Sequence, residues 1–235
     1  SESISAFFSF RQPLGNQTFY KNIKSLEPGN YIQIKNDKIV TKEYWSQKKF
    51  FLENKIDRGE KYYLEKIKKL LKSSVNYRLI SDVKVASLLS GGLDSSLITT
   101  IMQQKIGKNS LAFSIGYEQK NYNEFEYSKL VAKKLNIEHR IIHSNAEEYF
   151  DDLDELINVR GQPLTIPNEV SQYRLCKEIK KEATVVLSGS GADELFCGYG
   201  RIFSSADDYN KLLNLDILKN KEKKIFLKNV KLRYG

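Results

Sequence analysis

Cysteine, histidine and long apolar runs are all scarce in this sequence. Two of its 235 residues are cysteines and two are histidines. Cys176 and Cys197 have neither CxxC spacing nor a histidine nearby, which argues against a disulfide framework and against a structural zinc site. A reducing cytosol is the default environment for such a chain, so we expect a cytoplasmic location.

The two histidines, His139 and His143, are four residues apart. Residues 138–143 alternate in the manner of a β-strand, on which residues four apart share a face but lie about 13 Å from each other. That separation is too large for one metal ion. We therefore expect ordinary strand residues here and not a pair of metal ligands.

No segment is expected to enter a membrane. The longest apolar stretch, residues 85–102, is interrupted by serine, glycine and Asp94. The opening Ser-Glu-Ser-Ile-Ser lacks the basic and long apolar regions of a signal peptide. Hydrophobic residues make up 40% and charged residues 29% of the chain, which is typical of globular proteins and argues against global disorder.

The chain has 29 acidic residues (Asp and Glu) and 38 basic residues (Lys and Arg), which gives a formal net charge of +9. A polyanionic partner therefore has to be considered. Most of the basic residues are lysines that stand beside glutamates or on the polar side of helical patterns. We expect this charge to be solvated surface, not a dedicated nucleic-acid face, and we do not expect a nucleic-acid partner.

The first 50 residues differ in pattern from the rest. Residues 31–34 and 38–42 alternate apolar and polar side chains around Asn36-Asp37, which predicts a β-hairpin with a tight turn. Apolar residues between 60 and 79 recur every three or four positions and predict a helix. The length allows one to two domains, and we place a boundary near residue 50, between domains at 1–50 and 51–235.

Strand-like and helix-like segments alternate beyond the first predicted helix. Four short β-branched segments are predicted as strands: residues 83–89, 111–115, 139–142 and 184–187. Helices are predicted between them, at residues 123–135 behind an Asn-x-x-Glu start at 121–124, and at residues 170–181. Strands joined by helical crossovers predict an α/β fold with a doubly wound parallel sheet, covered by helices on both faces.

The first of these strands runs into Ser-Gly-Gly-Leu-Asp-Ser-Ser at residues 90–96, which we call the first loop, and then into a helical segment. Glycines let the backbone approach an anion, and the free N–H groups of a helix start favour negative charge. No Gly-Lys-Ser/Thr follows, so this is not a Walker A loop. A phosphate site is predicted; a glycine turn that merely caps a helix is the alternative.

The fourth strand ends in a second loop of the same kind. Residues 188–194 read Ser-Gly-Ser-Gly-Ala-Asp-Glu, and we call them the second loop. Ligands of doubly wound sheets bind beyond the carboxyl ends of the strands at the switch point. If the first and fourth strands are neighbours, the loops face each other, and Asp94 and Asp193 form an oxygen site for Mg2+ on a polyphosphate. Two unrelated helix caps are the alternative.

These motifs carry a resemblance to a known family. Residues 90–96 resemble the pyrophosphatase loop (PP-loop) of the ATP pyrophosphatases, and residues 188–199 are similar to the second loop of class B, glutamine-hydrolysing asparagine synthetases. Phe-Ser-Ile-Gly at 113–116 and Gly-Gln-Pro-Leu at 161–164 also match. Residues 18–31 are similar to the segment that closes the family's N-terminal glutaminase domain.

The resemblance implies a fold and a partial chain. The fold would be the adenine nucleotide α-hydrolase-like PP-loop type, preceded by a β-hairpin remnant of an Ntn-type glutaminase domain. The chain would be a fragment that lacks most of the glutaminase domain and the C-terminal part of the synthetase domain. Whether a homodimer forms is left open.

The resemblance also implies an activity. ATP and Mg2+ would activate the side-chain carboxylate of aspartate as an aspartyl adenylate with release of pyrophosphate, and ammonia from a glutaminase domain would then form the amide. The implied nucleotide-binding residues come from both loops and two strand ends: Leu89, Ser90, Gly91, Gly92, Leu93, Asp94, Ser95, Ser96, Ile115, Ser188 and Gly189. The implied catalytic residues are Ser190, Asp193 and Glu194, and the implied magnesium ligands are Asp94 and Asp193.

The sequence departs from the family pattern at several places. No cysteine precedes Cys176, whereas the family's glutaminase uses an N-terminal cysteine nucleophile. Ser190 stands where the family usually has an acidic residue, and Cys197 where glycine is usual. Two other functions therefore stay open: an amide or lactam synthetase acting on another carboxylate, and a catalytically silent nucleotide-binding or nucleic-acid-modifying module.

Overall fold

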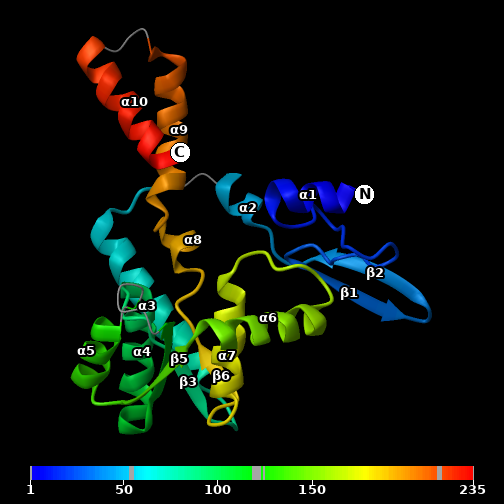
Figure 1. Cartoon of the computed structure of the whole chain (residues 1–235), viewed down its shortest axis with the longest axis vertical. Coiled ribbons are helices and arrows are strands. Elements are labelled where there is room, and N and C mark those ends of the chain that lie inside the picture. Colours follow the sequence, from blue (N-terminus) through cyan, green and yellow to red (C-terminus); the bar gives the residue numbers. More distant parts are fainter. Residues whose placement is uncertain (1, 53–55, 118–122, 124, 216–218, 235) are drawn as a thin grey trace.

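A computed structural model describes residues 2–52, 56–117, 123, 125–215 and 219–234 of the chain (Figure 1). Its strands form two separate sheets, one of two strands and one of four. The smaller sheet is a hairpin near the N-terminus, while the larger one lies among the helices of the remaining chain. No helix in the described part of the chain is both long and apolar enough to cross a membrane.

The predicted hairpin is confirmed. Strands β1 (Asn30–Lys35) and β2 (Lys38–Glu43) pair antiparallel, with Ile34 opposite Ile39. Both turn residues have positive φ, 48° at Asn36 and 58° at Asp37, as a two-residue turn of the twisted hairpin type requires. Most of the hairpin is exposed on both faces.

The four-stranded sheet confirms the predicted α/β class. It contains β3 (Val85–Leu88), β4 (Leu111–Tyr117), β5 (Glu138–Ser144) and β6 (Val185–Leu187), all parallel, in the order β5-β4-β3-β6. The chain moves from β3 outward to β4 and β5 and then returns to the other side of β3. The switch point of this doubly wound sheet therefore lies between β3 and β6, the strands that precede the two loops.

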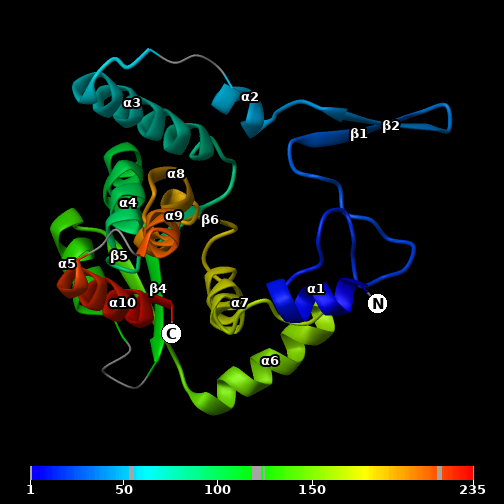
Figure 2. The ribbon, with the colours of Figure 1, turned by 90° about the horizontal axis from the view of Figure 1, so that it is seen from above.

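Helices cover both faces of this sheet (Figure 2). The first face is covered by α3 (Glu60–Arg78), α4 (Leu93–Ile106) and α5 (Phe125–Leu135), and a short 3-10 turn (Gly107–Asn109) follows α4. The opposite face is covered by α7 (Asn168–Ile179), with α6 (Ala146–Arg160) beside it. The helices predicted at 60–79, 123–135 and 170–181 are thereby found.

Successive side chains of each strand point to opposite faces of the sheet, so the hydrophobic core has one layer on each face. In β3, Val85 packs with Val75 of α3 and Met102 of α4. The next residue, Ala86, points the other way and packs with Leu175 of α7. Because successive strand residues face opposite sides, one short apolar strand supplies both layers.

Several helices were not predicted from the sequence. They are α1 (Glu2–Phe10), α2 (Gln47–Leu52), α6, α8 (Ala192–Phe196) and α9 (Gly200–Leu213). The last described helix, α10 (Asn220–Tyr234), is rich in lysine, in keeping with the expectation that the lysines lie on the polar side of helical patterns. Residues 121, 122 and 124 of the predicted helix start lie outside the described residues. The expected domain boundary falls within α2, and the division at residue 50 stays a prediction.

Candidate functional site

The first loop joins β3 to the N-terminus of α4. Ser96 N–H makes the first backbone bond of this helix, to Gly92 O at 3.1 Å. The preceding N–H groups of Leu93, Asp94 and Ser95 stand at the open end of the 14-residue helix. This end carries positive potential and suits an anion.

Serine hydroxyls hold the first loop in shape. The hydroxyls of Ser90 and Ser95 are 2.9 Å apart, and Ser90 Oγ also accepts the N–H of Gly92 at 3.2 Å. Gly91 has φ of 91°, and a Cβ there would lie 2.5 Å from Cβ of Tyr127 in α5. A glycine is therefore required at Gly91 by both its backbone conformation and its contact with α5.

The second loop packs directly on the first. A Cβ at Gly189 would lie 2.8 Å from the backbone N of Ser95 and 3.0 Å from Cβ of Asp94. Within this loop the hydroxyls of Ser188 and Ser190 are 2.7 Å apart, and Ser188 Oγ accepts the N–H of Ser190. Adjacent parallel strands thus bring together two loops that are nearly one hundred residues apart in sequence.

The three predicted acids have different surroundings. Asp94 is half-buried and lines a cavity between the loops and the nearby helices. Oδ1 of Asp193 lies against Gly198, where a Cβ would be only 1.7 Å away. Oε1 of Glu194 accepts the hydroxyl of Tyr199 at 2.9 Å, and this bond raises the pKa of Tyr199. Glu194 thereby fixes the turn after α8.

No group of three or more side chains in the described ranges has the arrangement of a metal centre. A magnesium ion on a nucleotide commonly takes only one or two protein carboxylates, together with phosphate oxygens and water. A magnesium ion bound to a nucleotide therefore does not need a group of three protein ligands. That Asp94 and Asp193 bind such an ion stays a prediction.

Leu89 and Ile115, the two strand-end residues that are predicted to contact the nucleotide, are buried to different extents. The side chain of Leu89 is 1% exposed and packs in the core, so its backbone is the part near the loop. Its N–H donates to Phe113 O at 2.8 Å, and its carbonyl accepts the hydroxyl of Ser114. Ile115 is half-buried and packs against the α7 side of the core.

Ser114 also contacts His139, at 2.7 Å between Oγ and Nε2. Because the only proton of the Ser114 hydroxyl goes to Leu89 O, Nε2 of His139 has to donate. Burial, assisted by the charge of Lys129, lowers the pKa of His139 from its ordinary value of 6.5. Sequence reasoning missed this chain of bonds because it crosses three strands.

A cavity of about 510 Å³ opens beside the loops. Of the predicted site residues, it is lined by Leu93, Asp94, Ser188, Gly189 and Ser190. Its other walls come from α3, α4 and α8, including Ser74 and Arg78 of α3, which belong to no sequence motif. The remaining predicted residues lie outside its lining.

One polar atom of the first loop supports a phosphate ligand. The hydroxyl oxygen of Ser96 is buried and has no hydrogen-bond partner among the described residues. A buried hydroxyl normally has a partner. Together with the open N-terminus of α4 and the close approach at Gly189, this atom fits a site built for an anionic group.

Comparison with known proteins identifies the family. The family model for asparagine synthase matches residues 66–233. The chain is 33% identical over 198 residues to asparagine synthetase [glutamine-hydrolyzing] 1 of Bacillus subtilis, covering 84% of this chain and 31% of that protein. It is 30% identical over 199 residues to putative asparagine synthetase [glutamine-hydrolyzing] 2 of Methanocaldococcus jannaschii, covering 84% of this chain and 38% of that protein.

This chain thus spans about a third of the length of the relatives it matches. Among solved structures, it is similar to an NH3-dependent NAD synthetase of Campylobacter jejuni, with a TM-score of 0.42 and 22% identity over 58% of this chain and 60% of that one. The family model covers well over half of the residues and includes both loops. This chain therefore belongs to the asparagine synthase family.

Proposed function

We propose that this chain is the nucleotide-binding part of an ATP-dependent amide ligase that activates a carboxylate substrate. Its sequence resemblance names the side-chain carboxylate of aspartate as that substrate. The observation that carries the proposal is the packing of Gly189 against Asp94 and Ser95, 2.8 Å from the Ser95 nitrogen. Loops that only capped their own helices would have no need for this contact.

In this proposal, ATP lies across the two loops. The phosphates lie against the first loop, where the serine hydroxyls and free N–H groups donate hydrogen bonds. The nucleoside lies against the strand ends and the second loop, at Leu89, Ile115, Ser188 and Gly189. Asp94 and Asp193 hold Mg2+, which would offset the charge of the phosphates.

The reaction proceeds in two displacements. A carboxylate oxygen of the substrate attacks the α-phosphorus of ATP, and the bond to the departing pyrophosphate breaks. The acyl carbon of the resulting adenylate is then attacked by ammonia, and AMP leaves as the amide forms. Ser190, Asp193 and Glu194 of the second loop stabilise and position the reacting groups, because the chemistry depends mainly on positioning and charge neutralisation.

The ammonia of this reaction comes from a glutaminase domain in our proposal. Residues 1–50, with their hairpin, would be the closing segment of such a domain. A cytoplasmic location and a homodimer are compatible with this proposal, and neither is needed for the chemistry.

A second candidate function keeps the reaction and changes the acid. Ser190 is neutral where the family usually has an acidic residue, and its hydroxyl is paired with that of Ser188 at 2.7 Å. An uncharged group at this place suits a carboxylate substrate other than aspartate. The product would then be a different amide or a lactam.

Calorimetric titration with ATP, with and without Mg2+, tests the proposal. We expect binding that requires Mg2+ and weakens at least about tenfold in Asp94→Asn and in Asp193→Asn, since each removes a charge that holds the metal. Asp82→Asn is the matched control, because Asp82 is exposed just before β3, at the opposite edge of the sheet. Unchanged ATP affinity in both loop variants would refute the proposed site.

A further inference from the structure

The cavity beside the two loops has the size of a small-molecule site. Its volume of about 510 Å³ lies within the range of about 300–1,000 Å³ that is common for ligand pockets. Its lining includes the second loop and Asp94 and, from a different part of the chain, α3. A molecule that fills this cavity would contact both the loops and α3.

Arg78 is the one cation among the described residues that line the cavity. Its guanidinium donates to Ser74 O at 3.0 Å and to Ser74 Oγ at 2.9 Å, both within α3. None of the ion pairs found among the described residues involves Arg78. Its planar group therefore keeps donors for an anionic ligand, and guanidinium binds carboxylates in a two-point geometry.

The space between Arg78 and the loops is mostly apolar. Its lining includes Leu71 of α3, Leu97 of α4 and Phe196 of α8. Leu97 is 42% exposed and Phe196 is 48% exposed, so these side chains are in contact with water. An aliphatic chain in the cavity would remove part of this surface from water and be bound for that reason.

The cavity offers little to a positively charged amino group. Asp94 is the one carboxylate among the described lining residues, and the proposed function assigns it to Mg2+. Ser190, at the position where the family usually has an acidic residue, is uncharged. Apart from Asp94, the α-ammonium of free aspartate would thus face an arginine, serine hydroxyls and apolar side chains, with no further carboxylate as a counter-ion.

We infer that this cavity binds the acid substrate, and that the substrate is a dicarboxylate with an aliphatic spacer and no free amino group. One carboxylate pairs with Arg78, and the other faces the two loops, where it is activated. The inference rests on the proposed function and selects the second of its two candidate substrates. Arg78 is in this view a specificity-determining residue.

Adipate is the probe, titrated into the chain in the presence of Mg2+ and a non-hydrolysable ATP analogue. We expect adipate to bind at least about tenfold more tightly than hexanoate, which has the same length and one carboxylate, or than aspartate. Arg78→Gln should abolish the preference for adipate over hexanoate. Arg78→Lys should restore part of it, because a point charge remains.

Lys72→Gln is the control, since it also removes one positive charge from an exposed position of α3 but lies outside the cavity lining. It should leave adipate binding unchanged. Equal adipate affinity in Arg78→Gln and the natural chain, or tighter binding of aspartate than of adipate, would overturn the inference.

The nucleotide titration separates this inference from the proposal on which it rests. If the chain binds the ATP analogue with Mg2+ but does not bind adipate, the inference fails and the ligase proposal stands. If it binds neither, both fail. Arg78→Gln should bind the nucleotide as the natural chain does, because Arg78 contacts neither loop by a hydrogen bond or an ion pair among the described residues.

Discussion

Gly189 sets the distance between the two loops. Its backbone lies so close to Asp94 and Ser95 that a side chain has no room: the nearest atom to an added Cβ would be the Ser95 nitrogen, at 2.8 Å. The obstructing atoms belong largely to backbone at the start of α4, which cannot rotate away as a long side chain would. The requirement for glycine here is steric and is not caused by an unusual φ.

We predict that Gly189→Ala lowers the free energy of unfolding by about 1–3 kcal/mol, because the loops have to move apart. The same movement should weaken ATP binding. Gly200→Ala is the control, since a Cβ at Gly200 would meet nothing within 4 Å. Urea denaturation and ATP titration of both variants check this, and equal stability of the two would contradict the close packing.

Ser114 connects the end of β3 to β5. It donates to the carbonyl of Leu89 and accepts from His139, and it is itself buried at 5% exposure. We predict that Ser114→Ala costs about 1–3 kcal/mol of stability, because the Leu89 carbonyl and the half-buried His139 both lose the Ser114 hydroxyl as a partner. Ser73→Ala, at an exposed position of α3, should change stability by less than about 0.5 kcal/mol in the same denaturation experiment.

His139 makes stability depend on pH in a defined window. Its pKa is lowered in the folded state, mainly by burial. As the pH falls through 6.5, the unfolded chain takes up a proton at this histidine while the folded chain does not, so stability decreases on acidification from about pH 7.5 to 5.5. His139→Gln should make this decrease shallower in thermal unfolding measured across the range. An identical slope would exclude the contribution of His139.

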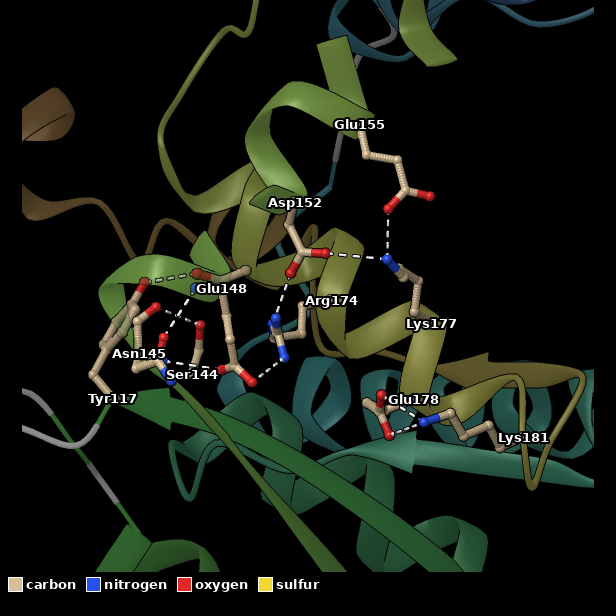
Figure 3. A network of polar contacts seen from close by, with 11 residues as sticks. Tyr117, Ser144, Asn145, Glu148, Asp152, Glu155, Arg174, Lys177, Glu178 and Lys181 are labelled. Atoms are coloured by element: carbon tan, nitrogen blue, oxygen red, sulfur yellow. Dashed lines mark hydrogen bonds and ion pairs between the residues drawn. The ribbon is translucent and has the colours of Figure 1, made fainter. Parts of the chain in front are cut away.

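Helices α6 and α7 are joined by a network of charges around Asp152 (Figure 3). The Asp152 side chain is only 5% exposed and accepts Nε of Arg174 at 2.6 Å and Nζ of Lys177 at 3.2 Å. Arg174 also contacts Glu148 at 3.0 Å, and Lys177 contacts Glu155 at 2.6 Å. Through α7 this network supports the face of the sheet opposite α4.

We predict that Asp152→Asn lowers the free energy of unfolding by about 3 kcal/mol, because it leaves the largely buried Arg174 without its main partner. Glu155→Gln is the matched control, as it removes a carboxylate from the same Lys177. The Glu155 side chain is 49% exposed, so its loss should cost less than about 1 kcal/mol. Comparable losses for both variants in urea would show that burial does not determine the effect.

At the scale of the whole molecule, the hydrophobic core belongs to the second part of the chain. The residues of all three core clusters lie between residues 71 and 187. Residues 1–50 contact this body through the hydroxyl of Tyr20, which donates to the carbonyl of Gly161. The exposed hairpin extends away from the four-stranded sheet (Figures 1 and 2).

We predict that removal of residues 1–50 leaves a folded chain whose ATP affinity changes by less than about twofold, because distant and independent parts contribute additively. Circular dichroism and ATP titration check this outcome. Tyr20→Phe in the full-length chain measures the contribution of the hydrogen bond to Gly161 by itself. Loss of nucleotide binding on truncation would show that the first 50 residues complete the site.

Most of the fold could be predicted from short stretches of the sequence. Asn36-Asp37 specifies its turn by itself, and the β-branched strands and the glycine loops could be recognised from neighbouring residues. In the capping box of α6 the side chains of Asn145 and Glu148 each accept the backbone N–H of the other. This is also a local signal, although α6 was not predicted. The short α8 has no periodic pattern long enough to reveal it.

The sequence by itself determined the parallel α/β sheet, the hairpin and the two loops, because each depends on residues within a few positions of one another. Only the tertiary structure determined which distant residues contact the loops and the strands that precede them. The pairing of β6 with β3 placed Gly189 on Ser95, the register of β4 and β5 placed His139 on Ser114, and the packing of α3 placed Arg78 in the cavity wall. Contacts between residues far apart in the chain arise only when strands pair and helices pack, and no local pattern encodes them.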